Sequence, residues 1–202
     1  MIRISAKGDL EAIRHWRENE DKTMTDLLVD LRREAPANKY MLAGGAFAEA
    51  MEHIGYGDFE SIEAKGWKFN FKLDKSMVVP VVRELKAEMP YSTPSGDVTL
   101  VGVCDGLNGT ELRDAKLTEN PSPEKYLESW QWKAYLVLFG AQSFTYDLFK
   151  CRPYDEVDKE VTIIDYIPLT MYRYPGIEQD VQNAVNEAAE IISKHCPERV
   201  KP

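Results

Sequence analysis

Two aspartates and a lysine are spaced so that they could hold a metal ion and activate water. Asp114 follows Asp105 by nine positions, and Lys116 follows two positions later. Asn108 and Gly109 lie between the aspartates, and Asn-Gly between apolar stretches is a strong hairpin signal because a two-residue type I′ turn needs positive φ at both positions. Hard divalent cations prefer carboxylate oxygens. A neighbouring ammonium could activate a water molecule or neutralise developing charge.

The hairpin predicts which of these side chains share a face. With the Asn-Gly pair as the loop, Asp105 lies opposite Leu112, and Asp114 and Lys116 follow on the same face because side chains alternate along a strand. The aspartates are then diagonal neighbours, about 5.5–8 Å apart at the backbone, and two carboxylates converge at that distance only around a cation. The alternative is a solvated strand face with an ordinary Asp114–Lys116 ion pair.

Two further segments complete a resemblance to a known family. The helix expected after Ser122-Pro123 carries Gln131 and Tyr135 in the pattern Q-x-x-x-Y, and residues 44–52 read GGAFAEAME. The hairpin resembles the D…(D/E)-x-K signature of the PD-(D/E)XK nuclease superfamily, and the other two segments resemble motifs of its RecB-like exonuclease branch. All three occur in the family's order, within residues 40–170. Small stand-alone members of this kind are often phage or mobile-element enzymes.

The resemblance implies a restriction-endonuclease-like core that hydrolyses phosphodiester bonds with Mg²⁺ or Mn²⁺. It implies that Asp105, Asp114 and the carbonyl oxygen of Ala115 are metal ligands. Lys116 would orient or deprotonate the attacking water, and Gln131 would hold the lysine, the water or a phosphate.

The outer ligand and a nucleic-acid contact follow from the same resemblance. Many RecB-like members carry a histidine where this chain has Ala48. The outer metal ligand is therefore assigned to Glu49, with Glu52 one helical turn on as the alternative. Tyr135 would lie near the nucleic acid. The iron–sulfur nucleases of CRISPR systems hold four cysteines, whereas this chain has three, so no such cluster is expected.

A basic and aromatic stretch offers a second contact with nucleic acid. Aromatic residues at 67, 69 and 71 interleave with Lys65, Lys68, Lys72 and Lys75. Such a pattern suits single-stranded nucleic acid, through phosphate contacts and base stacking. The strict alternation favours the other interpretation, a strand with its aromatic side chains in the core and its lysines in water.

The elements that must position these residues follow from the periodicity. Helices are predicted in the N-terminal third, over about 123–139, and from 175 onward. Strands are predicted at about 67–73, 83–90, 97–107, 110–117, 143–151 and 160–168. This order predicts an α+β (mixed α/β) fold, with a β-meander in a central mixed sheet flanked by helices. We expect one nuclease domain over residues 1–202: a helical part (1–56), the sheet and active-site core (57–170) and a C-terminal helix (171–202).

Composition limits the function classes. The chain has 202 residues, with 25 basic and 34 acidic side chains and a formal net charge of −9. This balance argues against a protein that coats nucleic acid through bulk charge, but it allows a local basic groove. Scattered cysteines suit a reducing compartment, and the longest apolar run, residues 134–139, is too short to span a membrane. We expect a cytoplasmic protein, in the host cytoplasm if it is phage-encoded.

The sequence therefore suggests a metal-dependent DNA nuclease, an exonuclease of recombination or repair. It would act on linear single- or double-stranded DNA alone, as a homo-oligomer or beside a separate recombination partner. The alternative is an inactive nuclease-fold subunit that binds nucleic acid or serves in assembly. A third hypothesis, an interaction domain with a coincidental motif, predicts an Asp114–Lys116 pair open to solvent.

Overall fold

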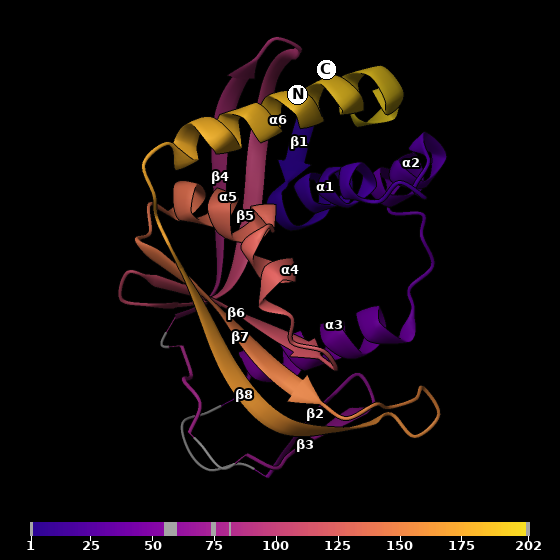
Figure 1. Cartoon of the computed structure of the whole chain (residues 1–202), viewed down its shortest axis with the longest axis vertical. Coiled ribbons are helices and arrows are strands. Elements are labelled where there is room, and N and C mark those ends of the chain that lie inside the picture. Colours follow the sequence, from indigo (N-terminus) through magenta and orange to yellow (C-terminus); the bar gives the residue numbers. More distant parts are fainter. Residues whose placement is uncertain (1, 55–59, 74–75, 81, 201–202) are drawn as a thin grey trace.

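A mixed β-sheet forms the centre of the computed structural model, which describes residues 2–54, 60–73, 76–80 and 82–200 (Figure 1). Over these residues the sheet has eight strands in the order β1-β5-β6-β7-β8-β3-β2, with β4 also paired to β5. The strands are β1 (Ile2–Ser5), β2 (Ser61–Ala64), β3 (Trp67–Phe71), β4 (Val82–Thr93), β5 (Gly96–Asn108), β6 (Glu111–Thr118), β7 (Ser143–Cys151) and β8 (Glu160–Tyr172). The predicted fold class, a mixed sheet flanked by helices, is confirmed.

Helices cover both faces of this sheet. They are η1 (Ala6–Leu10), α1 (Glu11–Glu18), α2 (Met24–Arg32), α3 (Lys39–Glu52), α4 (Pro123–Leu127), α5 (Trp130–Phe139), α6 (Ile177–His195) and η2 (Pro197–Arg199). Alternate residues of β7 enter two different apolar clusters: Leu148 joins the one formed with α1, α2, α5 and α6, and Phe149 joins the one formed with α3. Successive side chains of a strand point to opposite faces, so α3 and α5 lie on opposite sides of the sheet. None of the helices in the described residues is long and apolar enough to cross a membrane.

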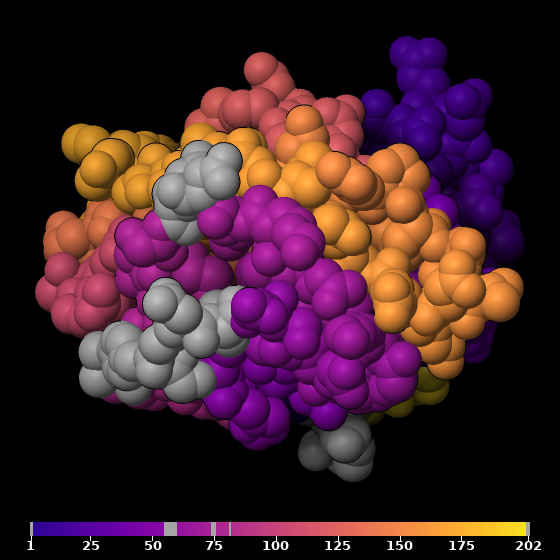
Figure 2. Space-filling model, turned by 90° about the horizontal axis from the view of Figure 1, so that it is seen from below, coloured from indigo at the N-terminus to yellow at the C-terminus, as the bar shows by residue number. Residues whose placement is uncertain are grey.

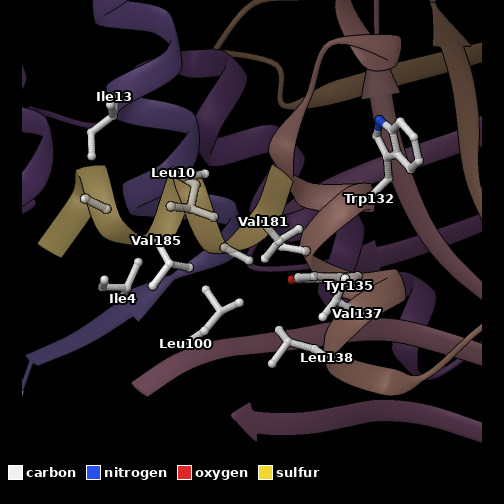
Figure 3. Packing of buried hydrophobic residues seen from close by; sticks show 14 of the residues in the cluster. Ile4, Leu10, Ile13, Leu100, Trp132, Tyr135, Val137, Leu138, Val181 and Val185 are labelled. Carbon is white, nitrogen blue, oxygen red and sulfur yellow. The ribbon is translucent and has the colours of Figure 1, made fainter. Parts of the chain in front are cut away.

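The larger cluster holds the N-terminal segment against the sheet. Ile4 of β1 and Leu100 of β5 lie beside Val181 and Val185 of α6 (Figure 3). The prediction of a purely helical part over 1–56 is wrong at its start, because β1 pairs in parallel with β5. Four residues are too few to show a strand period, and the edge that accepts β1 exists only in the folded sheet.

The helix predicted over 123–139 is two helices. Ser129 stands between α4 and α5 as the N-cap of α5, and its hydroxyl accepts a hydrogen bond from the backbone N–H of Gln131 at 3.1 Å. Serine side chains compete for backbone groups in this way and begin helices more readily than they continue them. Gly140 ends α5 with φ 62°, the left-handed conformation that glycine adopts without steric cost. The interruption places Gln131 in the first turn of α5.

A buried carboxylate fixes the turn that follows β1. Asp9 is fully buried in η1, a π-helical turn, and accepts a hydrogen bond from the backbone N–H of Ser5 at 2.7 Å. Its two oxygens also pair with Arg33 at 3.0 Å and with Arg199 at 2.9 Å. One acid thereby joins β1, the end of α2 and the C-terminal segment.

Replacing Asp9 tests how much this junction stabilises the fold. We expect Asp9→Ala to lower the free energy of unfolding by about 3 kcal/mol, since removing one partner of a buried ion pair leaves the other uncompensated. Urea unfolding measures the change. Glu88→Ala, which removes the exposed pair with Arg3, is the matched control and should cost far less. Equal losses in the two variants would contradict the structural role of Asp9.

Candidate active site

The site lies where two strands share one edge of β5. β1 pairs with residues 98–101 of β5, and β6 pairs with residues 106–108. Residues 102–105 of β5 lie between these two stretches, and η1, which follows β1, turns away from the sheet next to them. We call the space bounded by residues 102–105, β6 and η1 the strand gap.

The hairpin register differs from the predicted one. Leu107 pairs with Leu112 and Asn108 with Glu111, so the loop is formed by residues 109–110, with Gly109 at φ 64°. The predicted pairing, which has residues 108–109 as the loop, is therefore wrong. The loop lies one residue further along the chain. The ladder ends at the pair Gly106–Arg113, and continuing it would place Asp105 directly opposite Asp114. The shift moves the partner of Asp105 by two residues. The predicted common face does not hold for the side chains: Asp114 contacts Gln131 of α5, whereas Asp105 lies in the gap between β5 and β6 and lines a pocket beneath α3.

The Asp105 side chain lies in the strand gap, at the end next to the β5–β6 hairpin. Its Oδ2 accepts a hydrogen bond from the backbone N–H of Ala115 at 3.0 Å. The N–H and C=O of one residue in a strand point to the same side. The carbonyl oxygen of Ala115 therefore opens on the same gap as the Asp105 carboxylate, as the ligand set implied by the family resemblance requires.

Asp114 is a fully buried carboxylate with partners from three elements. Gln131 of α5 donates a hydrogen bond from Nε2 to Oδ1 at 2.6 Å. Lys116 of β6 forms an ion pair with Oδ2, and Lys7 of η1 lies 3.9 Å from Oδ1. The structure thus brings together Asp105, Asp114, Lys116 and Gln131. Because the carboxylate is fully buried and the Lys116 side chain is only 21% exposed, the alternative of a solvated strand face is wrong.

The environment shifts the pKa values of these groups away from their ordinary values. Burial, with the adjacent Asp114 carboxylate, raises the pKa of Asp105 to about 7. Burial also disfavours the charged form of Asp114, but the Lys116 and Lys7 ammonium groups and the Gln131 hydrogen bond outweigh it and hold its pKa below the ordinary value. Burial lowers the pKa of Lys116, so its amine gives up a proton more readily than an exposed lysine does.

The geometry of α5 explains why a glutamine and a tyrosine four residues apart belong together. Residues at i and i+4 lie on one face of a helix, and this face of α5 meets the strand gap. Gln131 reaches Asp114, while the hydroxyl of Tyr135 donates to the carbonyl oxygen of Val103 in β5 at 2.6 Å. A Cβ on Gly102 would lie 2.8 Å from the Tyr135 ring, so the close approach of α5 needs glycine there.

The expectation that Tyr135 contacts nucleic acid is corrected by its burial. Its side chain is 1% exposed and lies among Val137, Leu138 and Val181 (Figure 3). A residue this buried cannot meet a strand in solution. Tyr135 instead supplies a hydrogen-bond donor to a carbonyl in the part of β5 that pairs with neither β1 nor β6.

Glu11 of α1 holds the start of α5. Its Oε1 accepts hydrogen bonds from the Ser129 hydroxyl at 2.6 Å and from the backbone N–H of Gln131 at 3.0 Å. Its Oε2 pairs with Arg14 at 2.9 Å. A carboxylate at a helix N-terminus satisfies free N–H groups and complements the helix dipole. Sequence analysis missed Glu11, which lies 120 positions from Gln131.

A pocket opens from the strand gap toward α3, on the face opposite α5. Asp105 and Ala115 line it on the sheet side, and Ala48, Met51 and Glu52 line it on the helix side. Of the two acids considered for the outer ligand, Glu52 is the one that lines the same pocket as Asp105. The preferred candidate, Glu49, does not line this pocket; it is half-exposed and pairs with Lys65 at 2.6 Å.

Glu84 of β4 is a further acid, which interacts with Glu52 and belongs to no sequence motif. Its neighbours Arg83 and Leu85 pair with Gly106 and Cys104, which places Glu84 across the ladder from Asp105. Its φ of 51° is unusual for a residue other than glycine. Burial and the nearby Glu84 raise the pKa of Glu52. A positive φ inside a strand leaves no trace in the pattern of residue types, so no sequence signal indicated it.

The donor set fits a hard divalent cation. Asp105 and Asp114 bring two carboxylates to one gap, where burial and the neighbouring Asp114 carboxylate raise the pKa of Asp105 to about 7. Among the described residues, no three His, Cys, Asp or Glu side chains are grouped as a metal cage. Two carboxylates and a backbone carbonyl, all oxygen donors, match the way Mg²⁺ is held, with water and substrate phosphates completing its shell.

The basic stretch follows the second interpretation, a strand with a buried aromatic face. The aromatic side chains Trp67 and Phe69 are buried in the cluster beneath α3, whereas Lys65 and Lys72 are exposed and Lys68 is half-buried. Lys75 lies outside the described residues. Figure 2 shows the surface that this segment (purple) forms beside the orange β7–β8 part of the chain. Lys65, Lys68 and Lys72 thus remain a predicted phosphate contact outside the strand gap.

Comparison with solved structures places the fold. The structure of SSO0001 aligns with a TM-score of 0.53 and 12% identity over 100% of this chain and 89% of that chain. A phage related exonuclease from Haemophilus somnus 129PT aligns with a TM-score of 0.52 and 13% identity over 94% of this chain and 95% of that chain. At such identities the likeness establishes a shared fold. No protein-family model and no curated protein matches the sequence.

A double-mutant cycle tests the clamp that Glu11 places on α5. We expect Glu11→Ala and Ser129→Ala each to cost about 1 kcal/mol in unfolding free energy, as removal of a helix cap does. Because the two side chains share a hydrogen bond, the double variant should cost less than the sum, with a coupling of about 0.5 kcal/mol or more. Urea unfolding gives all three values. Strictly additive costs would show that the Glu11–Ser129 hydrogen bond does not hold α5.

Proposed function

We propose that this chain is a metal-dependent DNA nuclease, an exonuclease of recombination or repair, that hydrolyses phosphodiester bonds of linear DNA. The observation that carries the proposal is the convergence of Asp105, Asp114, Lys116 and Gln131 on one gap of the sheet. A purely structural sheet has little use for a fully buried carboxylate beside a second acid and a lysine that is only 21% exposed, because burying charge is costly. The fold shared with a phage related exonuclease supports the same conclusion.

The chemistry of the strand gap suits phosphodiester hydrolysis. Asp105, Asp114 and the Ala115 carbonyl would hold Mg²⁺ or Mn²⁺, which supplies Lewis acidity and lowers the pKa of a bound water. Burial lowers the pKa of the Lys116 amine, so that after losing its own proton to solvent the neutral amine would take a proton from the attacking water. Its present ion pair with Asp114 keeps it next to that carboxylate.

Gln131 would keep Asp114 oriented throughout the reaction. Its amide donates to one carboxylate oxygen, so that the other faces Lys116. Glu11 fixes the backbone of Gln131 from the other side. A group held by packing and hydrogen bonds need not reorganise as charge develops on the phosphate, and such preorganisation accounts for much of enzymatic rate enhancement.

A cleavage assay decides between the nuclease and the inactive binding subunit. End-labelled single- and double-stranded linear DNA is incubated with Mg²⁺, Mn²⁺ or a chelator. We expect degradation that requires metal and falls at least about 100-fold in Asp114→Ala and in Lys116→Ala, because each removes a charged group at the reacting centre. The control Lys86→Ala removes an exposed lysine paired with Glu88 and should retain activity. Binding without cleavage by the wild type would favour the non-catalytic subunit.

Calorimetric titration with Mn²⁺, without DNA, tests the ligand set. Asp105→Asn and Asp114→Asn should each weaken Mn²⁺ binding at least about tenfold, since each removes a charged oxygen ligand. Glu49→Gln should bind Mn²⁺ as the wild type does, because Lys65 already occupies its carboxylate. Glu52→Gln should weaken binding moderately, since Glu52 lines the pocket with Asp105. A loss confined to Glu49→Gln would restore the assignment made from the sequence.

A further inference from the structure

We propose that Lys7 is a substrate-binding residue of this site, whose ammonium group holds a phosphate of the DNA strand beside Asp114. The proposal rests on the proposed nuclease function and assigns a role to a residue that lies outside every sequence motif identified above. It comes from the position of η1 in the strand gap, from the exposure of the Lys7 side chain and from the way the turn is held.

Lys7 lies on the solvent side of the buried acid. Its Nζ is 3.9 Å from Oδ1 of Asp114, and its side chain is 53% exposed, whereas that of Lys116 is 21% exposed and that of Asp114 is fully buried. Of the two ammonium groups around Asp114, Lys7 is therefore the one that an approaching strand would meet first.

The contact with Asp114 does not use the binding capacity of Lys7. A separation of 3.9 Å is ionic and too long for a hydrogen bond. The Oδ1 atom already accepts a hydrogen bond from Gln131 at 2.6 Å. An ammonium group has three N–H donors, so Lys7 can donate to phosphate oxygens without giving up its position.

The charge balance points the same way. In the strand gap, Asp105 and Asp114 face Lys7 and Lys116, so the four groups balance when all are charged. A divalent cation held by the two aspartates would leave both ammonium groups in excess. A phosphodiester anion carries one negative charge and offsets one of them, and Lys7 is the exposed cation that can meet it.

The turn that carries Lys7 is held more firmly than a surface turn requires. The Ser5 hydroxyl accepts a hydrogen bond from the Gly8 N–H at 3.1 Å, and buried Asp9 joins the turn to Arg33 and Arg199. These bonds flank Lys7 on both sides along the chain. They fix the backbone from which the Lys7 side chain reaches Asp114, and π-helical turns are frequent at functional sites.

The salt dependence of DNA binding isolates the interaction of Lys7 with phosphate. Removing one phosphate-binding cation reduces the slope of log K against log salt by about 0.7 for single strands. Binding of a fluorescein-labelled single strand is followed by anisotropy over a series of KCl concentrations, with Ca²⁺ in place of Mg²⁺. We expect Lys7→Ala to reduce the slope by about that amount, and Lys7→Arg to keep it.

Kinetics on the cleaved strand gives the second readout. We expect Lys7→Ala to lower kcat/KM at least about fivefold at low salt, mostly through KM, with little loss at high salt. The control Lys86→Ala removes a similarly exposed lysine that is also paired with a carboxylate. It should change neither the slope nor KM. Lys7→Ala should fold and show at most a small drop in the thermal unfolding midpoint, because Lys116 and Gln131 still pair with Asp114.

The outcomes separate this proposal from the proposed function. An unchanged salt slope in Lys7→Ala, or the same reduction in Lys86→Ala, would overturn the role of Lys7 even if the wild type cleaves DNA. A reduced slope restored by Lys7→Arg would support that role even if cleavage is absent, because the anisotropy measurement does not depend on turnover. A lower unfolding midpoint with an unchanged slope would make Lys7 a structural residue and overturn the proposal.

Discussion

β5 has an edge that two strands must share, and the candidate site is a consequence of that constraint. β1 takes residues 98–101 and β6 takes residues 106–108, so neither strand pairs with the stretch between them. Backbone groups inside a protein need partners. Here the Asp105 carboxylate accepts a hydrogen bond from the Ala115 N–H, and the Tyr135 hydroxyl donates one to the Val103 carbonyl oxygen. The carboxylate proposed as a metal ligand is thus positioned by one of the hydrogen bonds that satisfy the interrupted ladder.

The buried carboxylate of Asp114 ties the site to the rest of the fold. An isolated charge in a protein interior is very costly, so it must be paired and hydrogen-bonded. Its partners come from β6, α5 and η1: Lys116, Gln131 and Lys7. Each of the two helical elements is held in turn, α5 by Glu11 and η1 by Asp9. The N-terminal segment therefore acts as part of the site's support, although no nuclease motif lies in it.

The two faces of the sheet have different parts in the proposed chemistry. On the α5 face, Gln131 and the two lysines determine the charge and orientation of Asp114. On the α3 face, Asp105 and Ala115 open on a pocket that Glu52 also lines. Asp105 links the two faces because it lies where β5 and β6 separate. An overall negative chain can act on DNA in this arrangement, since the cationic groups are concentrated where a phosphate would be needed.

The sequence by itself determined the residue types of the site, most of the strands and the closeness of the two aspartates across the hairpin. That closeness survived an error in the hairpin loop, because the pairing moved by only two residues and leaves the aspartates across from each other. Only the tertiary structure decided that Tyr135 is a buried support, that Glu52 rather than Glu49 lines the pocket, and that Lys7 reaches Asp114. Those placements depend on how α3, α5 and η1 pack against the sheet. Such packing joins residues that are distant along the chain, and the local periodicity of a sequence carries no information about it.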